Sequence, residues 1–286
     1  MSAKYDRLSQ FFSDAGASLA SLIKVLLLSK GSSPANSEGE GKELVIMGNG
    51  PSLRNTIDKD FEWLVAHDLM AVNFAANSPD FFRLRPRYYV LADNHFFNSL
   101  HYDKNVKKLW ESFGAVSWDM TLLVPSKFKH LVAPLILHTR NISLRYFNLT
   151  PVEGFGWLKR NLFSMGLGMP RPRNVLIPAI MEAIRLGYSK IYLCGADHSW
   201  LKTLDVDEEN FVVSIQPHFY KDNEEEHQRV RETYKNLKLH EVIGSMAVAF
   251  KSYWEIADYA GRKKIEIINA TPGSMIDAFP RINKKD

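Results

Sequence analysis

The chain has 286 residues, of which 45% are hydrophobic and 24% charged, and 36 basic against 32 acidic residues give a formal net charge of +4. This length and apolar content predict one large α/β domain or two small ones, and they exclude a disordered or collagenous chain. The basic excess is too small to indicate a nucleic-acid partner, and the single cysteine excludes a disulfide scaffold. Because no unbroken run of 18 apolar residues occurs, we expect no single helix to span a membrane and expect a cytoplasmic protein.

The first 42 residues predict an amphipathic helix followed by a flexible linker. Apolar side chains from Leu8 to Ile23 recur at helical spacing, and the helix ends in the apolar sequence LIKVLLL. Such a helix lies on a membrane surface, here the inner face, or it packs on the core or on a second copy of the chain. Residues 31–42, GSSPANSEGEGK, have the composition of a linker. We therefore assign residues 1–42 to this segment and residues 43–286 to an α/β domain.

The α/β domain begins with a buried strand and a glycine-rich turn. Residues 43–47, ELVIM, are typical of a parallel strand covered on both faces. The turn that follows consists of Gly48, Asn49, Gly50, Pro51 and Ser52. Glycines between a strand and a helix let backbone N–H groups approach a phosphate at the positive end of the helix. The third glycine of the dinucleotide fingerprint is absent, which argues against an NAD enzyme.

Polar side chains also follow the next two predicted strands. Residues 69–74 end near Asn73, and residues 87–92 are followed by Asp93 and Asn94. The carboxyl ends of parallel strands line one crevice, where doubly wound folds bind their ligands. Asparagine amides there hold a base, a ribose or a phosphate without adding charge. We therefore expect these side chains to bind a nucleotide. The segment 138–168 is aromatic-rich, and its pattern fits an acceptor-binding insertion and plain packing equally well.

A helix–strand unit in the second half of the domain supplies further candidates. Residues 174–187 place apolar side chains on one helical face and end at a glycine, and residues 190–194, KIYLC, form the next strand. Asp197 and His198 follow at the carboxyl end of that strand, where catalytic groups belong. Cys194 is interpreted as a small apolar residue within the strand.

The region 199–245 predicts a lid over this crevice, with His218 and Tyr220 as side chains that exchange a proton or bind a phosphate. Residues 246–260 predict an amphipathic helix and residues 264–269 a last strand. Ser274, in the sequence TPGS, is expected to begin another helix beside the nucleotide. Together these elements predict a Rossmann-like, doubly wound and mostly parallel sheet with a lid insertion.

The order GNGPSL, Asn73, Asp93-Asn94, AIRLGYSKIYLCGAD and TPGS resembles the bacterial sialyltransferases of glycosyltransferase family 42. It also resembles their wider relatives, the MptE-like pterin diphosphokinases and the motility-associated flagellar glycosyltransferases. The resemblance spans residues 43–280. It implies a transferase that moves a CMP-sialic acid-like sugar onto a cell-surface glycan such as lipooligosaccharide, capsule or O-antigen. By resemblance, the residues that hold the nucleotide sugar are Gly48, Asn49, Gly50, Pro51, Ser52, Asn73 and Asn94.

The resemblance also implies a histidine base toward the acceptor hydroxyl and tyrosines on the leaving phosphate. The family's Gly-His-Ser segment is absent, since Gly244 is followed directly by Ser245. His218, beside Tyr220, is therefore the predicted base, with His198 and His240 as alternatives. No metal is required if hydrogen-bond donors stabilise the leaving phosphate; if Mg²⁺ is needed, Asp93 and Asp197 are its predicted ligands.

Two other functions stay open on the sequence. An MptE-like diphosphokinase would use the same turn for ATP and would need Mg²⁺ held by carboxylates. A family member without catalytic activity would bind a nucleotide or serve as a scaffold for polysaccharide assembly. The partners expected on the first hypothesis are a nucleotide-sugar donor and a glycan or glycolipid acceptor.

Overall fold

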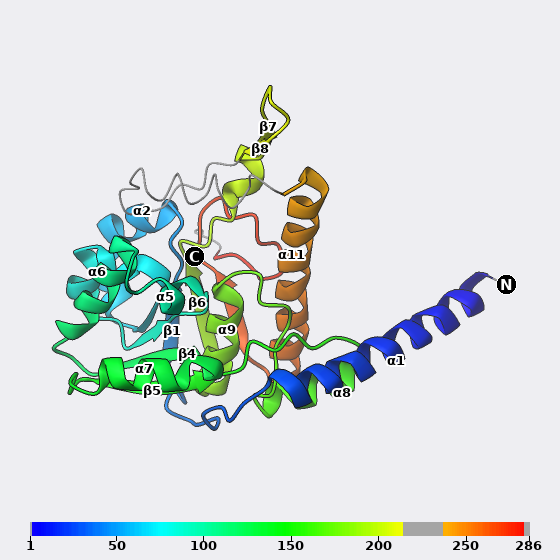
Figure 1. The fold of residues 1–286 in the computed structure, drawn as a ribbon, viewed down its shortest axis with the longest axis horizontal. Helices are drawn as coiled ribbons and strands as arrows, with labels where there is room; N and C mark the ends of the chain where they lie inside the picture. Colours follow the sequence, from blue (N-terminus) through cyan, green and yellow to red (C-terminus); the bar gives the residue numbers. More distant parts are fainter. Residues whose placement is uncertain (1, 214–236, 283–286) are drawn as a thin grey trace.

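The structure is a computed structural model that describes residues 2–213 and 237–282. Its centre is a seven-stranded sheet in which every pairing is parallel (Figure 1). The strands in chain order are β1 (Glu43–Met47), β2 (Asp68–Val72), β3 (Tyr88–Val90), β4 (Met120–Pro125), β5 (Ile142–Phe147), β6 (Lys190–Cys194) and β9 (Glu266–Asn269). Their spatial order is β5-β4-β3-β2-β1-β6-β9, so the chain moves outward from β1 and then returns to its other side. The switch point lies between β1 and β6, and the predicted fold class is confirmed.

Helices cover both faces of this sheet. One face carries α2 (Ser52–Lys59), α3 (Phe61–Val65), α4 (Asp80–Leu84), α5 (His95–Asn98), α6 (Lys104–Gly114) and α7 (Lys129–Ile136). The other face carries α8 (Gly156–Ser164), α9 (Leu176–Arg185) and α11 (Leu239–Arg262). Short 3₁₀ turns, η1 (Asn73–Asn77), η2 (Ser126–Phe128) and η3 (Ser199–Thr203), follow β2, β4 and β6. Neighbouring strand residues alternate between two clusters of buried apolar side chains, so both faces of the sheet are covered.

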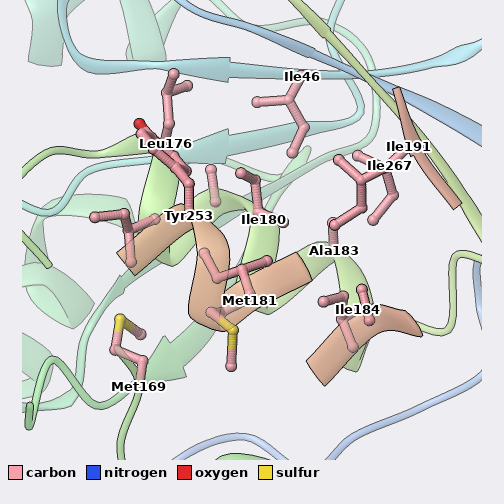
Figure 2. Packing of buried hydrophobic residues seen from close by; sticks show 14 of the residues in the cluster. Ile46, Met169, Leu176, Ile180, Met181, Ala183, Ile184, Ile191, Tyr253 and Ile267 are labelled. Atoms are coloured by element: carbon pink, nitrogen blue, oxygen red, sulfur yellow. The ribbon is translucent and has the colours of Figure 1, made fainter. Parts of the chain in front are cut away.

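The predicted helix–strand unit at 174–194 forms the centre of one apolar layer. The side chain of Asn174 accepts a hydrogen bond from the backbone N–H of Leu176, 3.0 Å away, which marks the start of α9. All ten residues of the helix are buried, and Figure 2 shows Ile180 and Ala183 against Ile191 and Ile267 of the sheet. A glycine with φ of +89°, Gly187, follows the helix, as its C-capping role requires.

The structure differs from the sequence prediction in two other segments. The undecided segment 138–168 contains the edge strand β5 and helix α8. The helix expected at Ser274 is not found, since the described residues 275–282 contain only bends, irregular backbone and one isolated β-bridge at Arg281.

Helix α1 spans Ser2–Leu28, and its first half projects from the body (Figure 1). Residues Arg7–Leu28 are long and apolar enough to cross a membrane, by length and composition only. This corrects the expectation that no single helix could span. An unbroken apolar run is expected of a spanning helix, whereas serine, glycine and the charged residues Asp14 and Lys24 interrupt this segment after Arg7.

The predicted flexible linker is packed along the body as an ordered strap, residues 29–42. The backbone N–H of Ser33 donates to the Tyr146 carbonyl at 2.8 Å, and that of Asn36 donates to the Arg185 carbonyl at 3.0 Å. Gly39 continues the contact with the Leu186 carbonyl at 2.8 Å. The composition of this segment is that of a flexible linker. The partners of these hydrogen bonds lie more than 100 positions away along the chain, so composition does not reveal them.

The predicted lid, 199–245, is described only at its two ends. The first end contains η3 and a two-stranded antiparallel hairpin, β7 (Asp205–Val206) with β8 (Val212–Val213). The second end is the first part of α11, which begins at Leu239. A small apolar cluster joins the two ends and consists of Val212, Val242 and Met246, with Trp200, Leu201 and Leu204 against it.

Candidate functional site

The glycine-rich turn after β1 crosses the turn after β6 at the switch point of the sheet. The backbone N–H of Gly48 donates to the Cys194 carbonyl at 2.7 Å, and that of Gly50 donates to the Gly195 carbonyl at 2.8 Å. A Cβ atom on Gly48 would lie 2.5 Å from the Gly195 oxygen, and one on Gly50 would lie 2.0 Å from an oxygen of Asp197. The glycines are therefore required by contact between the two turns, before any ligand is considered.

Asp197 places its carboxylate at the amino end of α2. Its Oδ2 accepts a hydrogen bond from the Ser52 hydroxyl at 2.7 Å, and its Oδ1 accepts one from the Ser52 backbone N–H at 3.3 Å. Burial raises the pKa of this carboxyl, and the bonds from Ser52 oppose that effect. The position that the sequence assigns to a ligand phosphate thus holds the protein's own carboxylate, which the helix dipole favours for the same reason.

The loop after β9 fixes the turn after β6 from the other side. The Thr271 hydroxyl donates to the Leu193 carbonyl at 2.9 Å and accepts from the Ala196 N–H at 3.0 Å. Ser274, predicted to contact a nucleotide, donates its hydroxyl to the Ala196 carbonyl at 2.7 Å. Ser274 is buried, so its position is that of a clamp on the neighbouring backbone.

Two asparagines at neighbouring strand ends keep an unused acceptor. The Asn49 amide donates to the Val72 carbonyl at 3.2 Å, which places the ends of β1 and β2 together. Asn73 has the left-handed φ of 51°, and its carbonyl accepts a 2.5 Å hydrogen bond from the Tyr89 hydroxyl. Among the described residues, the Oδ1 atoms of both asparagines are buried and have no hydrogen-bond partner. A buried acceptor without a donor is costly, and the Oδ1 atoms of Asn36 and Asn77 are in the same state.

His198 lies in an aromatic pocket beside this site. Its Nε2 is 2.7 Å from the Tyr253 hydroxyl, which donates to Asn174 Oδ1 at 2.9 Å. Its ring lies against Trp200, 4.8 Å between centroids, and near Phe250. Burial lowers the pKa of His198 to about 3, so the ring is neutral and a weak base at ordinary pH.

Asp93 and Asn94 are exposed at the end of β3, on the outward side of the asparagine pair. Asp93 Oδ1 accepts a hydrogen bond from the His95 backbone N–H at 2.8 Å, and Asn94 Oδ1 accepts one from the Lys127 ammonium group at 2.7 Å. Asp93 and Asp197 follow β3 and β6, which are three strand spacings apart, or about 14 Å. One Mg²⁺, with bonds of about 2.1 Å, does not bridge them directly. No group of three metal-ligating side chains occurs in the described parts of the chain.

The remaining predicted residues are distributed unequally. His218 and Tyr220 lie outside the described residues. His240 is exposed in the first turn of α11, and Pro51 precedes α2 at its N-cap position. The structure therefore brings together Gly48, Asn49, Gly50, Pro51, Ser52, Asn73 and Asp197 at the switch point.

Sequence reasoning missed three contributors to this region: Thr271, Asn174 and Lys127. Thr271 follows a strand end just as the asparagines do, so its position was a usable signal. Asn174 and Lys127 act through partners distant in sequence, and no local pattern marks them.

Fold and site together define a Rossmann-like α/β protein with polar side chains gathered at the switch point of its sheet. No family model matches the chain, and no curated protein matches it either. A solved structure with a similar chain path is that of the MAf glycosyltransferase from Magnetospirillum magneticum AMB-1, with 13% identity and a TM-score of 0.49. The match covers 96% of this chain but only 38% of that protein, and at this distance it carries no argument about activity.

Proposed function

We propose that the protein is a glycosyltransferase that uses a nucleotide-activated sugar. The observation that carries the proposal is the pair of unsatisfied acceptors, Asn49 Oδ1 and Asn73 Oδ1, at adjacent strand ends beside the switch point. Ribose hydroxyls and exocyclic amino groups are the donors that a nucleotide would present to them. The motif resemblance supports the finer assignment, a CMP-sialic acid-like donor and a cell-surface glycan or glycolipid acceptor.

The carboxylate of Asp197 favours a donor with a single phosphate. It occupies the amino end of α2, with both oxygens bonded to Ser52. A triphosphate at that helix end would meet this negative charge unless a metal ion neutralised it. A nucleoside monophosphate sugar carries less charge and needs fewer donors. This consideration favours a CMP-sugar over ATP.

In the proposed reaction, an acceptor hydroxyl attacks the anomeric carbon while the nucleotide phosphate leaves with the bonding electron pair. A general base takes the hydroxyl proton. His198 fits this role poorly because its pKa is lowered to about 3. Asp197 fits better among the described candidates because burial raises its pKa, and a raised pKa makes a carboxylate a stronger base. The resemblance favours His218 for the same role.

Calorimetry with single nucleotides tests the proposal. We expect CMP to bind, and we expect Asn49→Ala and Asn73→Gly each to weaken binding about tenfold, since each removes one hydrogen bond of about 1.4 kcal/mol. Glycine at position 73 keeps the left-handed backbone that the asparagine adopts. Asn55→Ala, at an exposed position of α2, is the matched control and should bind like the original chain.

Activity assays separate the alternatives. Transfer of sugar from a CMP-sugar in the presence of EDTA supports the proposal. EDTA-sensitive release of AMP from ATP and a pterin, without sugar transfer, would identify a diphosphokinase. If calorimetry detects no binding of CMP, UDP, ADP or ATP, the remaining function is a scaffold without catalytic activity.

A further inference from the structure

Helix α1 carries an apolar stripe that the body leaves uncovered. Leu8 and Leu26 lie 18 residues apart, about five helical turns, so they point in the same direction. Large apolar side chains fill the stripe between and beside them, with exposures from 40% to 82%. These residues are Leu8, Phe11, Phe12, Leu19, Leu22, Ile23, Leu26 and Leu27.

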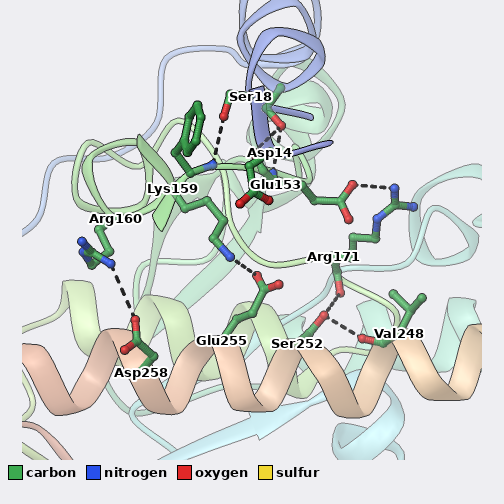
Figure 3. A network of polar contacts seen from close by, with 12 residues as sticks. Asp14, Ser18, Glu153, Lys159, Arg160, Arg171, Val248, Ser252, Glu255 and Asp258 are labelled. Atoms are coloured by element: carbon green, nitrogen blue, oxygen red, sulfur yellow. Dashed lines mark hydrogen bonds and ion pairs between the residues drawn. The ribbon is translucent and has the colours of Figure 1, made fainter. Parts of the chain in front are cut away.

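The neighbouring flank of α1 is the one that docks on the body. The Ser18 hydroxyl accepts the Phe155 N–H at 2.9 Å, and Ser21 exchanges hydrogen bonds with the backbone of Glu153 at 2.8 and 3.1 Å. Figure 3 shows Ser18 of α1 meeting this loop next to the Glu153–Arg171 pair. Gly154 permits the contact, because a Cβ there would lie 2.2 Å from the Ser18 hydroxyl. The helix is therefore held mainly by its serines, and the stripe touches the body at its edge, where the centroid of the Phe11 ring lies 5.5 Å from that of Phe155. The rest of the stripe stays exposed.

We propose that this stripe inserts into the surface of a lipid bilayer, and that insertion depends on loose lipid packing more than on anionic charge. The only charged residues between positions 8 and 28 are Asp14 and Lys24, of opposite sign. The polar side is otherwise built from serine, glutamine, glycine and alanine. The first turns of α1 add Lys4, Asp6 and Arg7, so the whole helix has a formal charge of only +1 (three basic and two acidic residues). A helix with bulky apolar groups and so small a net charge binds through buried apolar area, with little electrostatic attraction.

The same features disfavour the other ways of covering the stripe. A two-stranded coiled coil uses a narrow seam flanked by charged residues, whereas Phe11 and Ile23 make the edges of this stripe apolar as well. Ala15 in the middle of the seam would leave a gap between two helices. A transmembrane orientation is also disfavoured while α1 stays docked, because residues 2–17 reach only about 24 Å, less than the roughly 30 Å hydrocarbon core.

Vesicle flotation of the full chain tests the proposal, which does not rest on the nucleotide site. We expect at least tenfold stronger partitioning onto small dioleoyl-phosphatidylcholine vesicles than onto vesicles of saturated lipid. Adding phosphatidylglycerol should change partitioning less than threefold. The combined variant Phe12→Gln, Leu19→Gln and Leu26→Gln should lose binding at least tenfold, with the same thermal unfolding midpoint. Leu137→Gln, on an exposed leucine elsewhere, should bind unchanged.

Several results would overturn the proposal. These are no binding to any vesicle, equal binding by the triple variant, or binding that appears only with anionic lipid. Analytical ultracentrifugation tests whether a second copy of the chain covers the stripe instead. A stable dimer of the original chain that the triple variant abolishes, without vesicle binding, would assign the stripe to a second copy.

Discussion

At the scale of single residues, burial decides which polar side chains near the site change charge. Asp197 and His198 are adjacent in sequence but have different surroundings. Asp197 keeps hydrogen-bond donors from Ser52. His198 has Tyr253 and aromatic rings around it, and burial alone shifts its pKa. Burial therefore shifts the pKa of each group toward its uncharged form, while the donors from Ser52 oppose that shift only at Asp197.

We predict that the stability contributed by His198 is lost at acid pH. Its pKa is about 3 in the folded protein, against 6.5 in the unfolded chain. The neutral ring is therefore favoured by folding, its contribution is complete above pH 6.5, and it falls by about 1.4 kcal/mol per pH unit below that. Chemical denaturation at pH 7.5, 6, 5 and 4 measures the free energy of unfolding.

The variant His198→Gln removes the titration and can still bond to Tyr253. Carboxylates elsewhere titrate in both proteins, so the difference between the two unfolding free energies isolates the histidine. The free energy of unfolding of the original protein minus that of the variant should decrease as the pH falls from 7 to 4. A difference that stays constant would contradict the assignment.

At the scale of elements, the site is made by two turns that cross, one after β1 and one after β6. The backbone bonds from Gly48 and Gly50 join them, and the loop after β9 holds the second turn through Thr271 and Ser274. These hydrogen bonds hold the two turns together from both sides. The Oδ1 atoms of Asn49 and Asn73, at the ends of β1 and β2, are buried without a hydrogen-bond partner among the described residues.

We predict that Gly50→Ala disrupts this crossing. Its Cβ would lie 2.0 Å from Asp197 Oδ2 and 2.6 Å from the Gly195 oxygen, so one turn must shift. The free energy of unfolding should fall by about 1–3 kcal/mol, the usual cost of overpacking. CMP affinity should fall together with it, since Asn49 moves with the turn.

Gly244→Ala is the matched control for this substitution. Gly244 lies within α11, and a Cβ there meets no atom within 4 Å. Alanine should stabilise the helix by about 0.5–1 kcal/mol. Equal effects of the two substitutions would show that the crossing tolerates a side chain.

At the scale of the whole molecule, the strap of residues 29–42 connects α1 to β1 and is bonded on its way to strand β5 and to the end of helix α9. Arg185 donates to the Ser33 carbonyl at 2.5 Å, and Arg145 donates to the Pro34 carbonyl. Both guanidinium groups also pair with Glu182, which is 1% exposed. The strap therefore gives each of these two guanidinium groups a carbonyl acceptor in addition to Glu182.

We predict that deleting residues 1–42 destabilises the domain much more than deleting residues 1–28. The longer deletion removes one carbonyl partner from each of two buried arginines, which keep only Glu182 among the described residues. Each lost hydrogen bond to a charged group costs about 1.5–3 kcal/mol. The shorter deletion removes mainly the exposed helix and the contacts of its serines. Thermal and urea unfolding of both proteins give the comparison, and similar midpoints would contradict it.

The sequence by itself predicted the strands whose residues are apolar after a charged first position. ELVIM and KIYLC are buried on both faces of the sheet, so the pattern alone carried the information. It also placed Asn49, Asn73 and Asp197 after strand ends. It did not predict β5, ISLRYF, because an edge strand with exposed positions and an arginine has no such pattern.

Tertiary structure alone decided the rest, because the interactions involved join residues far apart in the chain. The strap has the composition of a linker, yet carbonyls and arginines from β5 and α9 hold it in place. Asp197 is 145 positions from Ser52, and only the parallel pairing of β1 with β6 brings its carboxylate to the start of α2. Local pattern therefore determined most of the elements and their polar ends, while long-range hydrogen bonding and burial determined which of those polar groups have a partner within the protein.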